Sequence, residues 1–123
     1  MGRKTGVAIP EEKIELVRQI AREEFTKNGY QGTSTNIIIQ RAQISKGSLF
    51  NLFGNKKNLY FELIRQSSGF FVNQLEMKLK KMPRDYVERM LWIGDLYLNM
   101  FIKEPELFSF LMTLICWRER KLS

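Results

Sequence analysis

Three lysines stand where helices are expected to begin, in the stretch SKGSLFNLFGNKK at residues 45–57. Lys46 follows Ser45, a residue type that commonly caps helices, and Lys56 and Lys57 follow a Gly-Asn pair that is typical of one helix ending before another. The backbone N–H groups at a helix start are partially positive, so a cation there is opposed by roughly 0.3–1 kcal/mol. A phosphate would be attracted by both the N–H groups and the ammonium groups. The spacing therefore predicts phosphate binding, with a solvated basic surface as the alternative.

The helix expected after Ser45 has a buried side and an outward side. A helical projection places Leu49, Leu52 and Phe53 together on the buried side. The outward side carries no acid and suits a DNA major groove, where lysine meets guanine or phosphate, asparagine pairs with adenine and glycine allows close approach. Its candidate contacts are Lys46, Gly47, Phe50 and Asn51. In the alternative, the phenylalanine folds under a neighbouring helix and the asparagine meets only water.

Two further helices are expected before this one. Residues 11–28 repeat apolar side chains at helical spacing, begin with two glutamates and end at an Asn-Gly pair. Residues 36–42 follow the hydroxyl side chains of residues 33–35, which can cap a helix, although three consecutive isoleucines make a strand the alternative. We favour a helix because Ile38 and Ala42 continue an i, i+4 stripe. A short turn then completes a helix-turn-helix arrangement.

The positive charge is concentrated in the first half of the chain. The net charge is +7, and residues 1–60 contain ten Lys or Arg against five Asp or Glu, whereas residues 61–123 contain ten against eight. No acid occurs between Phe25 and Phe61. The cations inside this acid-free window are Lys27, Arg41, Lys46, Lys56 and Lys57. This distribution favours an anionic partner.

Several kinds of catalytic and metal site are excluded by composition. The chain has no histidine, and Cys116 is its one cysteine. One chain therefore cannot form an internal disulfide, a cysteine zinc cluster, a Ser-His-Asp triad or a Cys-His pair. We expect no enzymatic activity, no cofactor and no metal, and we expect Cys116 to be a small buried apolar side chain.

The second half of the chain predicts three more helices and no strand. Apolar periodicity marks a long helix over residues 56–82 and another over about 84–102, and Pro105 suits the first position of a sixth. The residues that could line a mostly apolar, aromatic ligand pocket are Met90, Trp92, Tyr97 and Phe101. Core packing explains these four side chains equally well.

Residues 14–64 resemble the N-terminal domain of TetR-type transcriptional regulators. The resemblance is carried by Phe25, Asn28-Gly29-Tyr30, Gly32-Thr33-Ser34, Ile38, Ala42, residues 44–50, Phe53, Asn55-Lys56 and Leu59-Tyr60. It implies an all-helical homodimer whose first three helices, with the start of the fourth, bind double-stranded operator DNA. It also implies a small effector, bound in the C-terminal domain, that changes the spacing of the two recognition helices.

Carried over by position, the resemblance assigns DNA contacts to individual residues. Thr33 and Ser34, with the neighbouring Thr35, would meet phosphate at the start of the second helix. Ser45, which precedes the recognition helix, would also contact DNA, and Lys46, Gly47 and Ser48 would meet bases or backbone in the groove. Lys56 would hold a phosphate. Where the family usually has tyrosine, Phe50 lacks the hydroxyl that would bind phosphate.

Two further departures from the family pattern lead to expectations about the structure. Gln43 replaces the usual turn glycine, so a left-handed backbone there would cost on the order of 1 kcal/mol. Members of the family continue through several more helices, so we expect the sequence to be a piece of a longer protein.

These observations predict an all-α protein with a flexible basic arm (1–10), a helix-turn-helix DNA-binding domain (11–55) and the start of a helical regulatory domain (56–123). The predicted function is that of a cytoplasmic, ligand-responsive repressor with a hydrophobic or aromatic effector and no membrane partner. The alternative is a membrane-surface or hydrophobic-ligand binding protein without DNA specificity, which rests on the basic first half and the aromatic helices.

Overall fold

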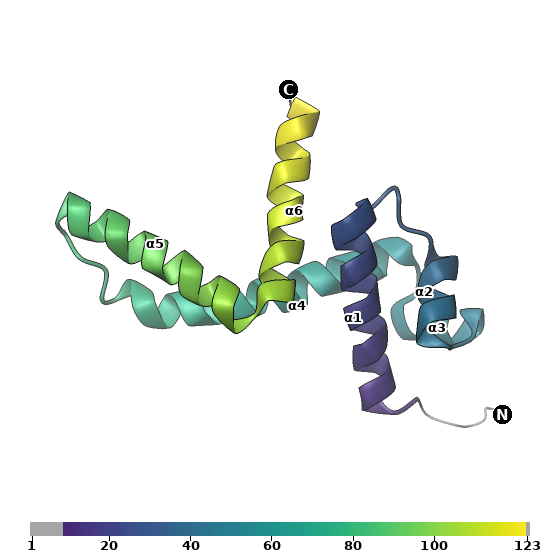
Figure 1. Ribbon diagram of the computed structural model, residues 1–123. Helices are drawn as coiled ribbons and strands as arrows, with labels where there is room; N and C mark the ends of the chain where they lie inside the picture. The colour runs from purple at the N-terminus through teal and green to yellow at the C-terminus, as the bar shows by residue number, and fades with distance from the viewer. Residues whose placement is uncertain (1–8, 123) are drawn as a thin grey trace. The chain divides into compact units, whose positions relative to one another are not determined.

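The regular elements of the protein are α-helices throughout the described residues. The computed structural model describes the backbone of residues 9–122 and the side chains of residues 9–116 (Figure 1). The helices are α1 (Glu11–Asn28), α2 (Thr35–Ala42), α3 (Lys46–Phe53), α4 (Lys56–Leu79), α5 (Tyr86–Lys103) and α6 (Pro105–Leu122). The all-α prediction is confirmed. Of the arm predicted at residues 1–10, residues 1–8 lie outside the described part of the chain.

Contacts divide the chain into two compact units, with the division between Tyr60 and Phe61. The N-terminal unit contains α1, α2, α3 and the first residues of α4. The C-terminal unit contains the remainder of α4 together with α5 and α6. The functional boundary expected between residues 55 and 56 stays a prediction.

The first helix begins and ends as its sequence dictates. Pro10 precedes the first turn, which carries Glu11 and Glu12, and acidic side chains there are stabilised by the helix dipole. At the other end Gly29 adopts a φ of 76°, a conformation that glycine reaches cheaply, and its N–H donates to the carbonyl of Phe25. The core side of α1 is formed by the buried residues Val17, Ile20, Ala21 and Phe25.

The three isoleucines at the centre of α2 behave as helix residues. Ile38 is fully buried, Ile37 is 43% exposed, and Ile39 is half-buried. Ala42, four residues after Ile38, is fully buried as well. A strand would place alternate residues on one face, so the observed i, i+4 pattern excludes the strand alternative for this segment.

The turn between α2 and α3 has a left-handed backbone at a residue that is not glycine. Gln43 has φ 56° and ψ 49°, and it is the one non-glycine residue with positive φ in the described chain. Its N–H donates to the carbonyl of Gln40, and the N–H of Ile44 donates to that of Ile39, each at 3.3 Å. These bonds satisfy carbonyls at the end of α2 and reverse the chain into α3.

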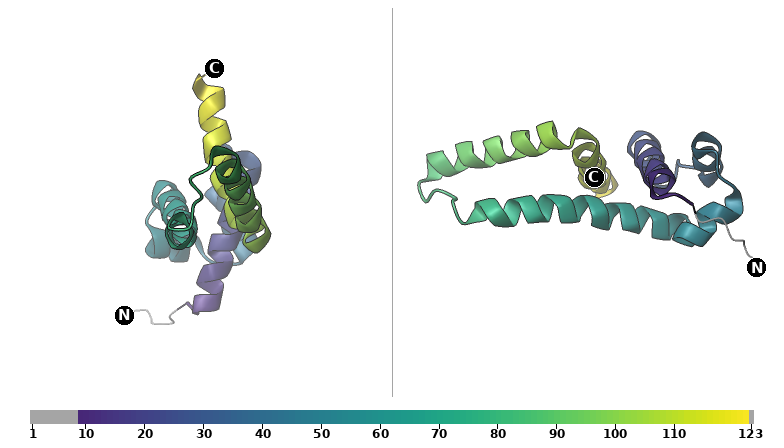
Figure 2. Two further views of the ribbon diagram at one scale, coloured as in Figure 1. Left: turned by 90° about the vertical axis from the view of Figure 1, so that its left-hand side faces the viewer. Right: turned by 90° about the horizontal axis from the view of Figure 1, so that it is seen from below.

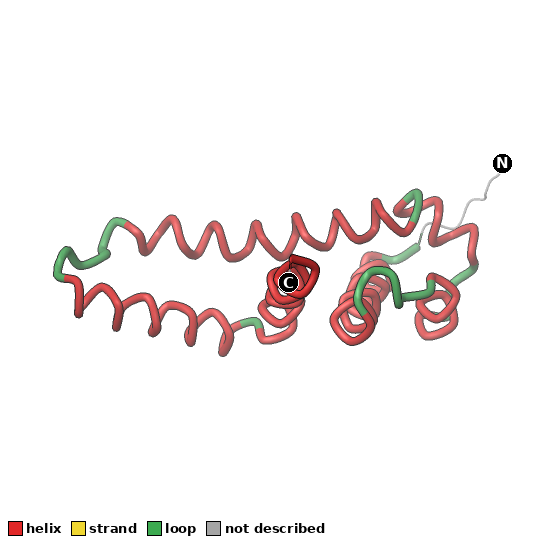
Figure 3. Tube along the Cα trace, turned by 90° about the horizontal axis from the view of Figure 1, so that it is seen from above, coloured by secondary structure: helices red, strands yellow, loops and turns green. Residues whose placement is uncertain are grey.

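The C-terminal unit is organised around one apolar cluster. The last part of α4 and α5 run side by side in opposite directions (Figures 2 and 3), and α5 contacts α6. The cluster contains the buried residues Phe71, Leu96, Met100 and Leu107, with Phe70, Leu75, Trp92, Phe108 and Leu111 packed against it. Other apolar side chains of α5 stay exposed, including Tyr86 (75%), Leu91 (70%) and Ile102 (65%).

Replacing the turn residue tests the backbone at Gln43. We expect Gln43→Gly to raise the free energy of unfolding by about 0.5–1 kcal/mol, because glycine reaches positive φ without a Cβ penalty of about 1–2 kcal/mol but is freer when unfolded. Gln43→Val, with a β-branched side chain, is expected to lower stability. Urea unfolding followed by circular dichroism measures both. A Gly variant no more stable than the Val variant would contradict the left-handed turn.

Candidate nucleic-acid interface

Three helices of the N-terminal unit begin with neutral caps and no acidic residue in the first turn. These are α2, α3 and α4, whereas α1 begins with two glutamates. The caps are Ser34 Oγ accepting from the N–H of Asn36 (3.1 Å), Ser45 Oγ from Ser48 (3.0 Å) and Asn55 Oδ1 from Asn58 (2.7 Å). A neutral cap satisfies one N–H group but leaves the partial positive charge of the helix start in place. All three starts therefore attract anions.

The hydroxyl residues before α2 do not share one environment. Ser34 is exposed and Thr35 is half-buried, so both lie at the start of the helix within reach of a surface ligand. Thr33 is only 3% exposed, and its Oγ1 lies 2.7 Å from the carbonyl oxygen of Gly29 and 3.0 Å from that of Glu24. Its hydroxyl therefore caps the end of α1. The expectation that the side chain of Thr33 meets phosphate does not fit this geometry.

The outward side of α3 presents the residues expected there. Lys46, Gly47 and Asn51 are exposed, and Ser48 is half-buried with its hydroxyl 2.8 Å from that of Ser45. A Cβ added at Gly47 would meet only Ser45 Oγ, at 3.9 Å, so nothing within the protein requires glycine at this position. At Gly32, by contrast, an added Cβ would lie 2.4 Å from the backbone oxygen of Asn28. The close backbone at Gly32 therefore requires a glycine, whereas Gly47 leaves open space on the surface of α3.

The inner side of α3 is narrower than the helical projection predicts. Leu49 and Phe53 are buried, at 2% and 8% exposure, but Leu52 is only half-buried. Phe50 is also half-buried, so it is neither fully outward on the DNA-facing side nor fully covered by a neighbouring helix. The ammonium of Lys46 lies 6.0 Å from the centre of the Phe50 ring, at the outer limit of a cation–π contact.

Lys56, at the start of α4, lies over an aromatic cluster. Its ammonium is 4.4 Å from the centre of the Tyr30 ring. Tyr30 stacks on Phe25 at 6.0 Å and meets Tyr60 at 4.8 Å, and Phe25 and Tyr60 pack edge to face at 4.8 Å. Burial of Tyr60, followed by the charge of Tyr30, raises the pKa of the Tyr60 hydroxyl above its usual value. The Tyr60 ring is therefore held as the neutral phenol within this cluster.

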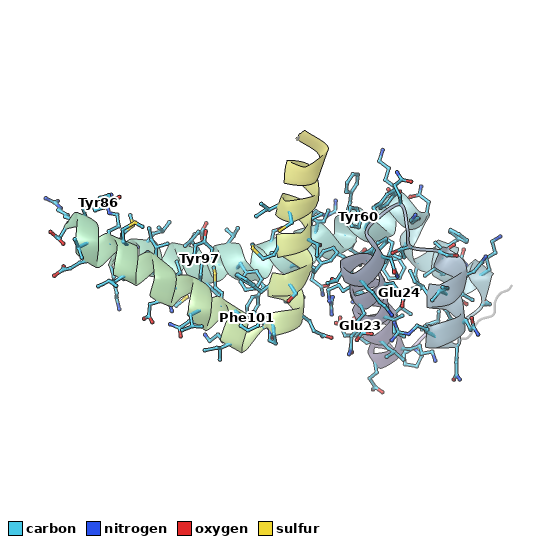
Figure 4. All side chains as sticks on the ribbon, turned by 45° about the horizontal axis from the view of Figure 1, so that its top comes forward. Glu23, Glu24, Tyr60, Tyr86, Tyr97 and Phe101 are labelled. Carbon is cyan, nitrogen blue, oxygen red and sulfur yellow. The ribbon has the colours of Figure 1, made fainter. Side chains whose placement is uncertain are left out.

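One cation of the acid-free window is neutralised by acids from outside it. Arg41 on α2 forms ion pairs with Glu23 (2.7 Å) and Glu24 (2.9 Å), which lie side by side on α1 (Figure 4). The hydrogen bond to Glu23, opposed in part by desolvation and followed by that to Glu24, raises the pKa of the Arg41 guanidinium. Arg41 therefore links α2 to α1, a role that the charge count along the sequence did not reveal.

Comparison with known proteins identifies this helix-turn-helix unit. Residues 18–63 match the profile of the bacterial regulatory proteins of the tetR family. The N-terminal unit is therefore similar to bacterial regulatory proteins of the tetR family. Over 45 residues the chain is 42% identical to the HTH-type transcriptional regulator QacR of Staphylococcus aureus. This matched segment makes up 37% of this chain and 24% of QacR. It is 29% identical over 52 residues to YhgD of Bacillus subtilis, an uncharacterized HTH-type transcriptional regulator, covering 42% of this chain and 27% of that protein.

A solved structure extends the similarity beyond the helix-turn-helix unit. A TetR family transcriptional regulator from Chloroflexus aurantiacus superposes with a TM-score of 0.65 at 29% sequence identity. The match covers 83% of this chain and 47% of that chain. This chain thus spans about half the length of the solved TetR regulator, and its matched segments span about a quarter of QacR and YhgD.

The four residues suggested for a ligand pocket do not lie on one face of α5. Met90, Tyr97 and Phe101 lie seven and then four residues apart and so share one face of the helix. Trp92 lies two residues after Met90 and so faces the opposite side. Trp92 packs against the buried cluster, and the rings of Tyr97 and Phe101 (Figure 4) each meet Phe108 of α6, at 6.3 and 5.8 Å. Met90 is 54% exposed. The structure therefore brings together two of the four.

Two other expectations concern cysteine and membranes. Cys116, expected to be buried, is exposed at the surface of α6, because the apolar side of this helix is formed by Leu107 and Phe110 instead.

Within the described residues, none of the helices combines the length and the apolar character that crossing a bilayer requires.

Removing the charge of Arg41 tests its assignment to the α1–α2 contact. We expect Arg41→Gln to lower the Tm at low salt, and the loss to shrink in about 1 M NaCl, where the Debye length is about 3 Å. Arg41→Lys should recover only part of the loss, because lysine cannot present a planar fork to two carboxylates. Thermal unfolding at both salt concentrations measures these effects. An unchanged Tm at low salt, together with a shallower salt dependence of DNA binding, would instead place Arg41 on phosphate.

Proposed function

We propose that this chain is part of a transcriptional regulator that binds double-stranded operator DNA. In the proposed complex α3 enters the major groove, and the starts of α2 and α4 lie on the phosphate backbone. The observation that carries the proposal is the presence, in one helix-turn-helix unit, of three helix starts that lack acids, with lysines at two of them. Each start offers backbone N–H groups to a phosphate, and the lysines add charge-assisted contacts.

Individual side chains have separate roles in this complex. Lys46 meets guanine acceptors or phosphate, Asn51 meets adenine, and Gly47 allows the backbone of α3 to approach the DNA closely. Ser34 and Lys56 hold phosphates on either side of the groove and so fix the position of α3. The match of residues 18–63 to the tetR family and the exposure of Lys46, Gly47 and Asn51 support these assignments.

The regulatory part of the proposal concerns the chain from residue 56 onward. We propose that it begins the effector-binding and dimerisation domain of a homodimeric repressor, as is typical of the family. The rings of Tyr97, Phe101 and Phe108 lie close together and form a surface suited to a hydrophobic or aromatic effector. About half of each Tyr97 and Phe101 side chain is exposed, so these two rings remain available to a small molecule.

The salt dependence of DNA binding tests the proposed phosphate contact. Each phosphate contact contributes about −0.9 to the slope of log K against log[salt]. We expect Lys56→Ala to make this slope less steep by about 0.9, the value of one phosphate contact. The same change should weaken binding to selected and mixed-sequence duplexes alike. Lys46→Ala should instead reduce the preference for a selected duplex, by about tenfold for one lost base contact. Fluorescence anisotropy with a selected 30-bp duplex and a mixed-sequence duplex measures both.

The same series includes the outcomes that would contradict DNA binding. If neither lysine substitution changes the affinity or its salt slope, the proposed interface is wrong. If the unmodified chain binds vesicles of anionic lipid but no duplex, the membrane-surface alternative is supported instead.

Adding a methyl group at Gly47 separates DNA approach from protein stability. We expect Gly47→Ala to leave the Tm unchanged or higher, since glycine in a helix is less stable than alanine by about 0.5–1 kcal/mol and space is available. We expect the same change to weaken the selected duplex about tenfold or more, because the methyl group lies between α3 and the groove. Gly94→Ala on α5 is the matched control, because Gly94 is exposed too and a Cβ added there would meet no atom within 4 Å. This control should not affect DNA binding. Equal DNA affinity for both variants would contradict the close approach.

A further inference from the structure

Tyr30 occupies a fixed position in the connection between α1 and α2. Its ring contacts two others that also contact each other, with Phe25 at 6.0 Å and nearly parallel (10°), and Tyr60 at 4.8 Å and tilted by 51°. Phe25 is 1% exposed and belongs to the core. The ring of Tyr30 is thus anchored on residues of α1 and α4 and has little freedom to move.

The Tyr30 ring lies closer to a lysine ammonium than the Phe50 ring does. The Lys56 ammonium lies 4.4 Å from its centre, whereas the Lys46 ammonium lies 6.0 Å from that of Phe50. A cation within about 6 Å of a ring face is attracted by the negative face of the ring. Lys56 is also half-buried, so its stem is partly enclosed beside the cluster.

An aromatic partner differs from a carboxylate because it leaves the positive charge of the lysine available to an anionic ligand. Arg41 is held by two glutamates that cancel its charge, so holding this side chain removes it from contact with an anion. A tyrosine ring carries no net charge, so Lys56 keeps its full charge and its ammonium can still donate to an acceptor away from the ring. The ring therefore orders the lysine without neutralising it.

Ordering a lysine before DNA arrives has a direct effect on affinity. A free lysine side chain loses much of its rotamer freedom when it is fixed on a phosphate, and this loss opposes binding. A lysine already held in place loses less.

We propose that Tyr30 is a positioning residue for DNA binding, whose ring holds the Lys56 ammonium at the start of α4 ready for a backbone phosphate. This inference rests on the proposed function. It adds a residue that does not itself touch the DNA and a reason for an aromatic side chain at position 30.

The contact is tested first in the free protein by NMR of the full chain. A lysine over a ring face has its side-chain methylene protons shifted upfield. We expect this shift for Lys56 in the unmodified protein, its retention in Tyr30→Phe, which keeps the ring, and its loss in Tyr30→Leu. Methylene protons of Lys56 at ordinary lysine positions in the unmodified protein would overturn the inference, whatever the protein does with DNA.

The effect on binding is tested by a double-mutant cycle with a mixed-sequence 30-bp duplex. We expect Tyr30→Leu to raise the Kd about two- to fivefold, in line with an exposed cation–π contact, and Tyr30→Phe to stay near the unmodified protein. In the Lys56→Gln background Tyr30→Leu should have no further effect, whereas in the Lys46→Gln background its effect should be retained in full. Full additivity with Lys56→Gln would overturn the inference.

Loss of folding and loss of the proposed function give different results. If Tyr30→Leu does not fold, as judged by circular dichroism, the NMR shift in the unmodified protein and in Tyr30→Phe decides between the outcomes. Upfield methylene protons in both support the inference, and their absence in either overturns it. If the shift is present but no duplex is bound by the unmodified chain, the proposed function fails, and the positioning role fails with it.

Discussion

The arrangement of the N-terminal unit depends on positive charge at helix starts that no acid in the first turn compensates. In α2, α3 and α4 the caps are Ser34, Ser45 and Asn55, which satisfy a backbone donor without adding negative charge. At α3 and α4 a lysine follows the cap directly. Each such cation is opposed by about 0.3–1 kcal/mol, a cost that burial of residues such as Ile38, Leu49 and Leu59 can offset. Burial of apolar side chains therefore lets the unit tolerate lysines at the starts of α3 and α4.

All five acidic residues of the first sixty lie on helix α1. Four of its glutamates form ion pairs with arginines: Glu11 and Glu15 with arginines of α1 itself, and Glu23 and Glu24 with Arg41 on α2. Of these pairs, only those with Arg41 join α1 to α2. The pair with Arg41 also removes one cation from the basic surface. The net charge of a segment is thus a poor guide to the charge that a ligand meets, because the partners come from other elements.

Local sequence rules predicted the helices well because the signals that begin and end them lie within a few residues. Gly29, Ser45 and Asn55 each act where the pattern predicted, and the burial of Ile38 and Ala42 decides between helix and strand. The site was less predictable. The contacts of Arg41 span 17 and 18 residues, and that of Lys56 with Tyr30 spans the whole of α2 and α3. Periodicity along one helix cannot reveal such contacts, and the same limit applies to Thr33, whose hydroxyl faces the end of α1.

The two helix-start lysines differ in how firmly the protein holds them. Lys56 is half-buried with its ammonium 4.4 Å from a ring that is itself anchored, whereas Lys46 is exposed and lies 6.0 Å from Phe50. A phosphate occupies the same position in any duplex sequence, so a fixed cation suits it and loses little freedom on binding. Base edges differ from site to site, and an exposed lysine can reach either a guanine acceptor or a nearby phosphate. In the proposed complex the firmly held lysine positions the protein on the backbone, and the loosely held one reads the groove.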